Sequence, residues 1–439
     1  MPPWQRWPDV RRVLRTLFLV LALLALLPAM LTPVYAQQHV PRRIAVPTGT
    51  VKTAQGDPYT PHLPRRALAY QRTRRVLGLI GMAWNLLGLW LFVRTGLGVR
   101  LRNAVYRTLR RPVPEDEAVP PLHALAFYYA AYALLLLLWN LPFGFGSLAI
   151  EHTYGFSRET AFGYLGDSLI SVGFNCAIIF PLWIAYRFYV RSPHRWWLWL
   201  WAGLVPLIFF VIVLQPVVVA PAYNHYTPLP AGPLRDKILD LADRAGIRNA
   251  RVLIEDTSRR TTHVNAYVNG LGPSAQIVIN DTALAQLPED QLLAMLAHEM
   301  GHYVEKHVWW GFLSGALGAG AFLWIASRLL PWMLKRWGER LHLRGLTDLA
   351  ALPLLMLFIS LFLLMQDPIA NGISRYMEHR ADAYGLRLAH LNDATARLFV
   401  GFAERDFSDP RPPALLHFWF GTHPTLSERI RFALSYREE

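Results

Sequence analysis

The sequence predicts a mainly α-helical, polytopic membrane protein that also carries one small α+β unit. Three observations lead to this fold class. Apolar residues make up 53% of the 439 residues, which is more than soluble domains usually contain. They gather in stretches of about 20 residues with almost no charge, long enough to cross the hydrocarbon core of a bilayer. Two further segments, 222–306 and 371–439, mix charged and apolar residues and are not membrane-like.

Seven stretches have the length and composition of membrane-spanning helices. They cover approximately residues 14–34, 76–97, 123–146, 167–190, 196–220, 308–333 and 347–367. The first stretch has two interpretations, because basic residues precede its Leu-rich centre and Val34-Tyr35-Ala36 resembles the cleavage site of a secretory signal peptide. We favour an uncleaved anchor, which makes this stretch the first of seven helices.

The formal net charge of +14 comes almost entirely from arginine, and the arginines lie mainly in short loops beside the apolar stretches. This placement fits anionic lipid headgroups better than a nucleic acid, so we expect the lipid bilayer as a partner and no nucleic acid. The scarcity of lysine favours a bacterial source and hence a bacterial inner membrane. Basic loops occur on both sides of the helices (98–122, 191–195 and 334–346 against 35–75), so the positive-inside rule leaves the orientation open.

The chain divides into three predicted parts. They are residues 1–65 with the signal-like helix and a Pro-rich, irregular linker, residues 66–221 with the N-terminal membrane helices, and residues 222–439 with both polar segments and the last two spans. In the third part, strand-type runs at 251–255 and 276–280 precede a helical pattern that begins at Pro288. We expect the two polar segments to fold together into one unit. The single cysteine, Cys176, excludes internal disulfides and a cysteine-based zinc cluster.

The strongest chemical signal is the run His-Glu-Met-Gly-His at residues 298–302. Pro288 and the two acids after it are a typical helix start, and residues four apart on a helix share one face. His298 and His302 can therefore both offer a ring nitrogen to one Zn²⁺ ion. Glu299 is rotated about 100° from His298, which places its carboxylate beside the metal as a general base.

A catalytic zinc needs a third protein ligand, and the residues leave its source open. His307 lies one residue too early for the third histidine of the longer H-E-x-x-H-x-x-G-x-x-H pattern, which favours a supporting or surface role. Glu378 on a later helix is the other source, and Asp382 on the same face could hold a ligating imidazole through its free N–H. A solvated helix with charged i, i+4 pairs has the same spacing. Gly301 leaves space for close packing near the motif.

Further segments carry a resemblance to a known family. They are Glu151–Phe156, residues 220–230 after the fifth predicted helix, the Asn-Ala-Tyr run at 265–267, the helix from Ser374 to Asp382, and His423-Pro424 followed by Arg429-Ile430. With the run at 298–302, these motifs resemble the type I CAAX prenyl protease family of seven-helix membrane zinc endopeptidases. The motifs follow the family's order over residues 68–439, whereas the first 65 residues match poorly.

The resemblance implies both a fold and a site. The helices would enclose a large wet chamber into which the metal faces. The implied residues are His298, His302 and Glu378 as ligands of one zinc ion per chain, Glu299 as general base and acid, His423 and Arg429 at the oxyanion, and Asn265, Ala266 and Tyr267 on an edge strand that pairs with an extended substrate. We count Asp382 among the catalytic residues as the partner of a ligating histidine.

We therefore expect a membrane-embedded zinc metalloendopeptidase that processes the C-terminal part of proteins or peptides, with or without a prenyl group. A quality-control membrane protease of the HtpX-like kind would use the same ligands, but it has far fewer helices ahead of the motif than the five here. A non-catalytic zinc-binding membrane scaffold is the third possibility. Glu299 argues against the scaffold, because a structural metal site needs no general base.

Overall fold

The computed structural model describes residues 53–54, 57–114, 119–214, 218–270 and 275–437. Six helical spans within these residues are long and apolar enough to cross a membrane. They are α3 (Arg65–Arg94), α5 (Leu122–Tyr154), α6 with α7 (Ala161–Asn175 and Ile179–Arg191), α8 (Trp196–Leu214), α13 (His307–Leu341) and α14 (Leu352–Ala389). Each overlaps one of the last six predicted spans, which confirms them. The predicted first span, residues 14–34, lies outside the described residues.

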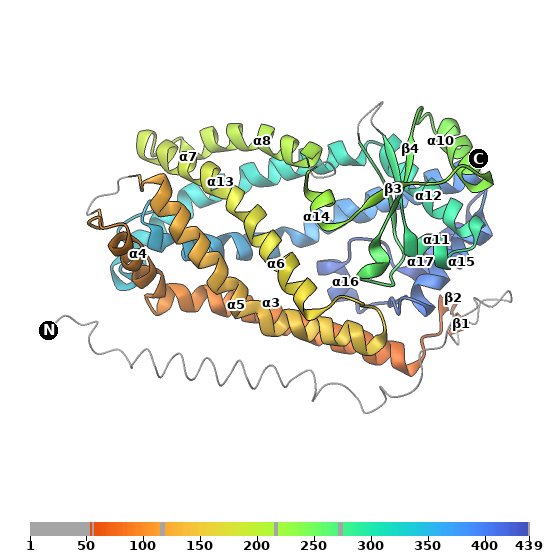
Figure 1. The fold of residues 1–439 in the computed structure, drawn as a ribbon, viewed down its shortest axis with the longest axis horizontal. Helices are drawn as coiled ribbons and strands as arrows, with labels where there is room; N and C mark the ends of the chain where they lie inside the picture. Colours follow the sequence, from red (N-terminus) through yellow and green to blue (C-terminus); the bar gives the residue numbers. More distant parts are fainter. Residues whose placement is uncertain (1–52, 55–56, 115–118, 215–217, 271–274, 438–439) are drawn as a thin grey trace.

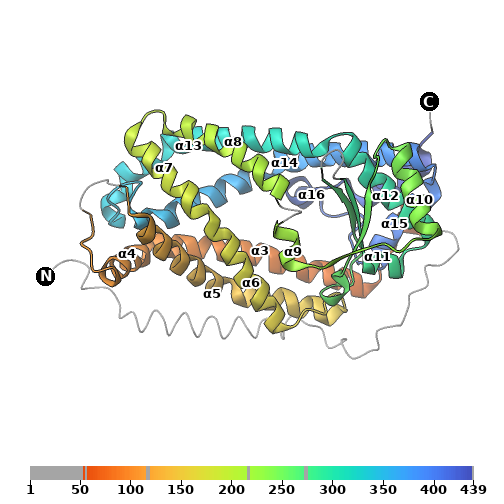
Figure 2. The same ribbon diagram turned by 45° about the horizontal axis from the view of Figure 1, so that its top comes forward.

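The spanning helices run along the long axis of the molecule, and a small sheet lies at one end (Figure 1). A second view shows α8 beside α13, and α3 and α5 together on another side (Figure 2); both pairs are in contact. α4 (Leu97–Thr108) lies at the end far from the sheet. At the sheet end, α12 (Glu289–Val304) from the first polar segment packs against α15 (Asn392–Glu404) from the second. The two polar segments therefore fold together, as predicted.

Two helices extend well beyond their predicted ends. α3 begins at Arg65, so basic residues that the sequence placed in a loop are helical, and one of them, Arg75, pairs with Asp409 near the C-terminus. α14 continues to Ala389, so the last span and the helix that carries Glu378 are one element. The change from apolar to polar side chains after the predicted span does not end the helix, because the intrahelical backbone hydrogen bonds continue regardless of side-chain polarity.

A four-stranded sheet forms the frame of the α+β unit, with the strand order β3-β4-β6-β5. The strands are β3 (Tyr226–Pro228), β4 (Arg251–Glu255), β5 (Ala266–Asn269) and β6 (Gln276–Asn280). The central strands β4 and β6 are parallel, and both outer strands are antiparallel to their neighbours. β4 and β6 are the two strands that the sequence predicts, because their β-branched and aliphatic residues favour a buried strand. The prediction of both strands is confirmed.

The helix with the His-Glu-Met-Gly-His run shares its core with this sheet. Leu296 and Met300 of α12 are fully buried in the same cluster as Ile277 and Ile279 of β6. Burial of each such side chain stabilises the fold by roughly 1.5–3 kcal/mol. The apolar face of α12 is thereby held on the sheet, which fixes the direction of its histidine face.

The segment before α3 is not wholly irregular, contrary to the prediction. β1 (Thr53–Ala54) and β2 (Asp57–Pro61) pair antiparallel. The hydroxyl of Thr60 in β2 lies 2.9 Å from that of Ser427 in α17 (Leu426–Ser435), and both side chains are buried. The sequence does not reveal this pairing, because it depends on contact with a helix more than 300 residues away.

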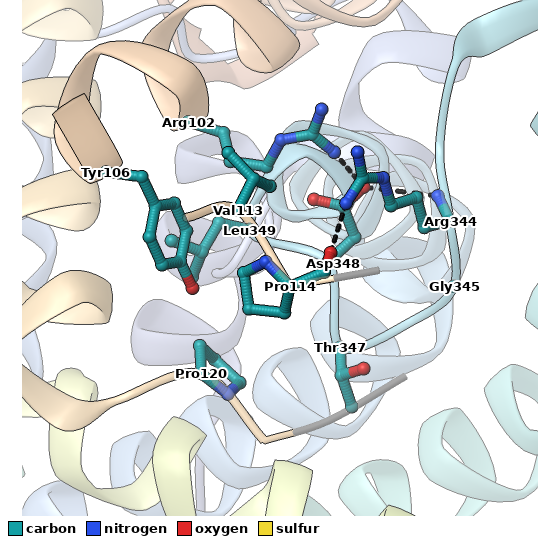
Figure 3. Close-up of a pocket in the computed structure, with 10 residues that line it drawn as sticks. All are labelled: Arg102, Tyr106, Val113, Pro114, Pro120, Arg344, Gly345, Thr347, Asp348 and Leu349. Atoms are coloured by element: carbon teal, nitrogen blue, oxygen red, sulfur yellow. Dashed lines mark hydrogen bonds and ion pairs between the residues drawn. The ribbon is translucent and has the colours of Figure 1, made fainter. Parts of the chain in front are cut away.

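A buried ion pair joins two elements at the end opposite the sheet (Figure 3). Arg102 of α4 donates to the carboxylate of Asp348 at 2.5 Å, and both side chains are almost fully buried. Asp348 also accepts from the backbone N–H of Ala350 at 3.0 Å and of Arg344 at 3.1 Å. A buried charge without its partner is costly, so this pair fixes where α4 meets the start of α14.

Candidate active site

Two histidines of α12 and one carboxylate of α14 converge on one point. The Nε2 atoms of His298 and His302 lie 3.1 Å apart. Oε2 of Glu378 lies 3.3 Å from Nε2 of His298, and Oε1 lies 3.4 Å from Nε2 of His302. Among the described residues, these three form the one group of His, Cys, Asp and Glu side chains that could hold a metal ion. They are the three ligands that the family resemblance implies.

The three donors suit a tetrahedral zinc ion. Two ligand atoms at about 2.0–2.1 Å from one tetrahedral centre lie about 3.4 Å apart. The two Nε2 atoms are 3.1 Å apart, and each lies 3.3 or 3.4 Å from one of the two oxygens of Glu378. Oε2 of Glu378 is buried and has no hydrogen-bond partner within the described part of the chain, as expected for an oxygen that binds a cation. Three donors also leave a fourth position for water or substrate.

The other ring nitrogen of each histidine has its own partner. Nδ1 of His298 lies 2.9 Å from Oδ1 of Asp382, and Nδ1 of His302 lies 2.8 Å from Nδ1 of His307. A hydrogen bond donated by Nδ1 fixes the tautomer whose Nε2 is free to bind a metal. Asp382 thus lies where the sequence predicted it. His307 is buried against His302 and is not a surface residue.

Close contact between α12 and α14 sets these distances. A Cβ on Gly301 would lie 3.0 Å from the carbonyl oxygen of Ala381, and a Cβ on Gly385 would lie 2.9 Å from the backbone nitrogen of His298. Any larger residue at either position would push the helices apart, away from the distance at which Glu378 meets the histidines. The sequence predicted close packing at Gly301, and it missed Gly385 because that glycine belongs to no motif.

Glu299 follows the first ligand on α12 and is partly buried. Burial raises the pKa of the Glu299 carboxyl. A carboxyl whose pKa is raised holds a proton more readily, so it is suited to take up a proton and to return it. The position and the electrostatics of Glu299 both fit a general base.

His423 approaches the same group from the loop that precedes α17. Its Nε2 lies 3.3 Å from Oε1 of Glu378, and 53% of its side chain is exposed. Its Nδ1 lies 2.8 Å from the hydroxyl of Thr422. The combination of closeness to the ligand group and exposure means that His423 can reach a bound substrate.

Arg429 contacts the carboxylate that holds His298. Its guanidinium makes two hydrogen bonds to Asp382, at 2.8 and 2.6 Å, and lies over the ring of Phe399. The side chain is 7% exposed. Nη2 of Arg429 also lies 3.9 Å from Oε2 of Glu378, and the role of Arg429 at the oxyanion stays a prediction. The two hydrogen bonds orient Asp382, which in turn contacts His298.

The run Asn265-Ala266-Tyr267 lies at the edge of the sheet, as expected. Ala266 and Tyr267 begin β5, which pairs with β6 on one side and is the last strand in the order. The carbonyl of Asn265 accepts from the backbone N–H of Asn280 at 3.1 Å. β5 also contacts α12, the helix of the two histidines. The outer edge of β5 can pair with an extended peptide close to the metal-binding group.

A network that the sequence did not predict joins the membrane helices to the start of this strand. Nδ1 of His263 lies 3.1 Å from Asp406, and Nε2 lies 3.7 Å from Glu151 at the end of α5. Glu151 also accepts a hydrogen bond from the hydroxyl of Tyr70 at 2.9 Å. Burial by itself lowers the pKa of His263, but hydrogen bonds and attraction from Asp406 and Glu151 outweigh it and raise the pKa to about 9. Glu151 belongs to one of the segments that resemble the family, Glu151–Phe156. Its partners lie far away in the sequence, so the sequence did not reveal the network.

Comparisons with known proteins identify the class. Residues 38–225 match the model of the CAAX prenyl protease N-terminal region with its five membrane helices, and residues 228–437 match the model of peptidase family M48. The fold and the site are those of an integral, multi-pass membrane metallopeptidase. The chain belongs to the CAAX prenyl protease family of M48 peptidases.

Individual relatives span most of the chain. An uncharacterized metalloprotease, YhfN, of Bacillus subtilis (strain 168) is 32% identical over 390 residues, which cover 87% of this chain and 89% of that protein. A CAAX prenyl protease 1 homolog of Arabidopsis thaliana is 29% identical over 324 residues, covering 72% of this chain and 74% of that one. The crystal structure of S. mikatae Ste24p has a similar fold, with a TM-score of 0.72, 21% identity and 99% of both chains covered.

Proposed function

We propose that this protein is a zinc endopeptidase whose metal ligands are His298, His302 and Glu378. The observation that carries the proposal is the convergence of these three side chains at 3.1 to 3.4 Å, with an orphaned carboxylate oxygen among them. Zinc held there lowers the pKa of a bound water toward about 7 and polarises a carbonyl group. Glu299 stands next to the ligands, which is why we assign catalysis and not a structural site.

Each protein group has a distinct task in peptide hydrolysis. Glu299 takes a proton from the attacking water and returns it to the leaving amine, a role that its raised pKa favours. His423, close to Glu378 and exposed, donates a hydrogen bond to the oxyanion that develops on the substrate. Asp382 and Arg429 keep His298 in the tautomer and orientation that the metal needs.

We infer that the substrate is an extended, CAAX-like segment at the C-terminus of a protein or peptide. The segment carries a prenyl group or lacks one. Two features support this inference: the outer edge of β5 can add a strand next to α12, and several relatives are named CAAX prenyl proteases. Asn265, Ala266 and Tyr267 would bind the substrate backbone. We also propose that the helices enclose a wet chamber around the site, and that the protein lies in a bacterial inner membrane.

The two alternative functions have less support. A quality-control protease of the HtpX-like kind lacks the five membrane helices ahead of the peptidase unit, whereas residues 38–225 of this chain match a family model that contains them. A scaffold needs no general base beside its metal ligands. Glu299, which directly follows His298 on α12 and has a raised pKa, suits that role. Both alternatives nevertheless predict different outcomes in the same experiment.

The experiment compares the purified full chain in detergent with Glu299→Gln and Glu378→Gln variants. Zinc content is measured for each protein, together with cleavage of a farnesylated CAAX peptide, its unprenylated twin and an unfolded soluble protein. We expect about one zinc per chain in the parent and in Glu299→Gln, with cleavage only in the parent, and loss of both zinc and cleavage in Glu378→Gln.

Other results would redirect the assignment. Cleavage of the unfolded protein without cleavage of either peptide would favour the quality-control function. Zinc in the parent without cleavage of any substrate would favour the scaffold. Equal cleavage by the parent and by Glu299→Gln would remove Glu299 from the mechanism, because the amide cannot accept the proton.

A further inference from the structure

One face of α14 links the metal-binding group to another helix. Five residues of this face follow one another at spacings of four, three, four and three, so they lie on one side of the helix. They are Leu364, Pro368, Asn371, Arg375 and Glu378. The short helix α16 (Ala414–Phe420) packs against α14. Glu378 is a proposed metal ligand, and the other four residues determine how α16 is attached.

Pro368 frees an acceptor for α16 within α14. Proline has no backbone N–H, so the carbonyl of Leu364, four residues earlier, loses its usual helical donor. The indole N–H of Trp419 donates to this carbonyl at 2.8 Å. Nδ2 of Asn371 donates to the carbonyl of Trp419 at 2.6 Å, and this bond satisfies one of the free carbonyls at the end of α16. Trp419 is therefore fixed to α14 through its side chain and through its main chain.

Arg375 contacts the turn that follows α16. Its Nη1 donates to the carbonyl of Gly421 at 2.6 Å and to the carbonyl of His417 at 3.4 Å. Arg375 is half-buried, and within the described part of the chain it makes no ion pair with a carboxylate. A guanidinium that donates to carbonyls at the end of a helix makes charge-assisted hydrogen bonds to the main chain. Arg375 therefore fixes the position of the backbone there.

The same turn carries His423. Nε2 of His417 donates to the carbonyl of His423 at 2.9 Å, so the end of α16 also contacts the main chain of His423. The imidazole Nε2 of His423 lies 3.3 Å from Oε1 of Glu378. Glu378 follows Arg375 by three residues, which is less than one helical turn. α14 thus holds both sides of this contact, because it carries Glu378 and, through Arg375, the turn with His423.

We propose that Arg375 is a positioning residue that holds the imidazole of His423 beside the metal-binding group. The inference rests on the proposed peptidase function, in which His423 donates a hydrogen bond to the oxyanion. Because 53% of the His423 side chain is exposed, its place depends mainly on the main chain that carries it. A donor stabilises an oxyanion at about 2.7–3.1 Å, so a small shift of the turn removes the contribution of His423. Arg375 acts through the turn and does not touch the substrate.

Cleavage kinetics of the full-length protein in detergent test the proposal, with the substrate that the parent cleaves best among the three above. Arg375→Met keeps a long side chain and removes both hydrogen bonds. Its kcat should fall about 10- to 100-fold, while KM and zinc content stay near the parental values. Arg375→Lys can still donate to a carbonyl, so its kcat should recover to within about fivefold of the parent.

A double-mutant cycle with His423 separates positioning from a general loss of structure. His423→Ala alone should lower kcat about 100-fold, as the loss of one oxyanion donor does. In that background Arg375→Met should cost less than about twofold more, because the residue that it positions is already absent. Equal losses from Arg375→Met in both backgrounds would overturn the proposal. A raised KM with an unchanged kcat would also overturn it, since Arg375 would then bind the substrate itself.

Amide hydrogen exchange of residues 414–425 tests the attachment without any cleavage. Exchange there should be faster in Arg375→Met than in the parent, because the turn loses its contact with α14. Arg387→Met is the matched control, since Arg387 is an exposed arginine of α14 that lies over the ring of Tyr384. It should match the parent in exchange and in kcat. Unchanged exchange in Arg375→Met would overturn the proposal. If the parent cleaves none of the substrates, the proposed function fails, and the exchange result still decides whether Arg375 holds the turn.

Discussion

The backbone of Gly385 on α14 lies against the backbone of His298 on α12, so closely that a Cβ on Gly385 would come within 2.9 Å of the His298 nitrogen and 3.0 Å of its Cα. Both contacted atoms belong to the main chain and cannot swing aside. Because Glu378 is carried by the same helix as Gly385, this contact sets the distance between the carboxylate and the two histidines.

Gly385→Ala should therefore weaken zinc binding about 10- to 100-fold and lower cleavage in parallel, because the added methyl forces the two helices apart. Zinc content after dialysis against a graded chelator measures the effect. Gly311→Ala on α13 is the matched control, since a Cβ there meets no atom within 4 Å. Parental zinc affinity in Gly385→Ala would show that the helix contact does not set the site.

Asp382→Asn should lose zinc affinity about 10- to 100-fold, because the amide orients His298 less well than the carboxylate does. It should also lower the free energy of unfolding by about 3 kcal/mol, since the buried charge of Arg429 would lose its close partner and keep only the longer 3.9 Å contact with Glu378. Chelator titration and thermal unfolding measure the two losses separately.

Replacing both partners separates these two effects. Asp382→Asn with Arg429→Met removes the unpaired charge, so the double variant should unfold at a higher temperature than Asp382→Asn alone while its zinc affinity stays low. A double variant that is no more stable than the single one would mean that the buried charge pair is not the source of the stability loss.

His307→Phe should reduce zinc affinity about tenfold, because the ring keeps its volume but no longer accepts a hydrogen bond from His302. Cleavage per bound zinc should stay near the parental value, since His307 does not touch the substrate. His123→Phe serves as the control, because His123 is exposed at the start of α5. If zinc affinity is unchanged in His307→Phe, the contact between the two rings does not support the metal.

The His263 network predicts a pH-dependent stability. The pKa of His263 is about 9 in the folded protein, against about 6.5 for an unfolded histidine. A raised pKa means that its stabilising contribution is complete below pH 6.5 and disappears as the pH rises through 9. Because 35% of the His263 side chain is exposed, solvent screening reduces this contribution to about 1 kcal/mol.

Thermal unfolding between pH 6 and pH 10 tests this prediction. The unfolding temperature of the parent should fall relative to that of His263→Gln as the pH rises from 6.5 to 9, because the glutamine cannot be charged. Parallel curves for the two proteins across this range would rule out the ion pairs with Asp406 and Glu151 as a source of stability.

Local patterns predicted much of the fold. The six described spans follow from the length of apolar runs, strands β4 and β6 from their β-branched residues, and α12 from Pro288 and the acids after it. The continuation of α14 beyond its apolar part and the pairing of β1 with β2 were not predicted. A change of polarity does not mark a helix end, and a short hairpin gains its stability from distant contacts.

The sequence by itself determined the class of this protein, because a 20-residue apolar run must satisfy its backbone within a membrane helix and a His-Glu-x-x-His run on a helix presents two imidazoles on one face. Only the tertiary structure decided that Glu378 is the carboxylate that meets them, that Nδ1 of His307 contacts Nδ1 of His302, and that Arg429 hydrogen-bonds to Asp382. These relationships depend on how α12, α14 and α17 pack against one another, which local sequence patterns do not specify.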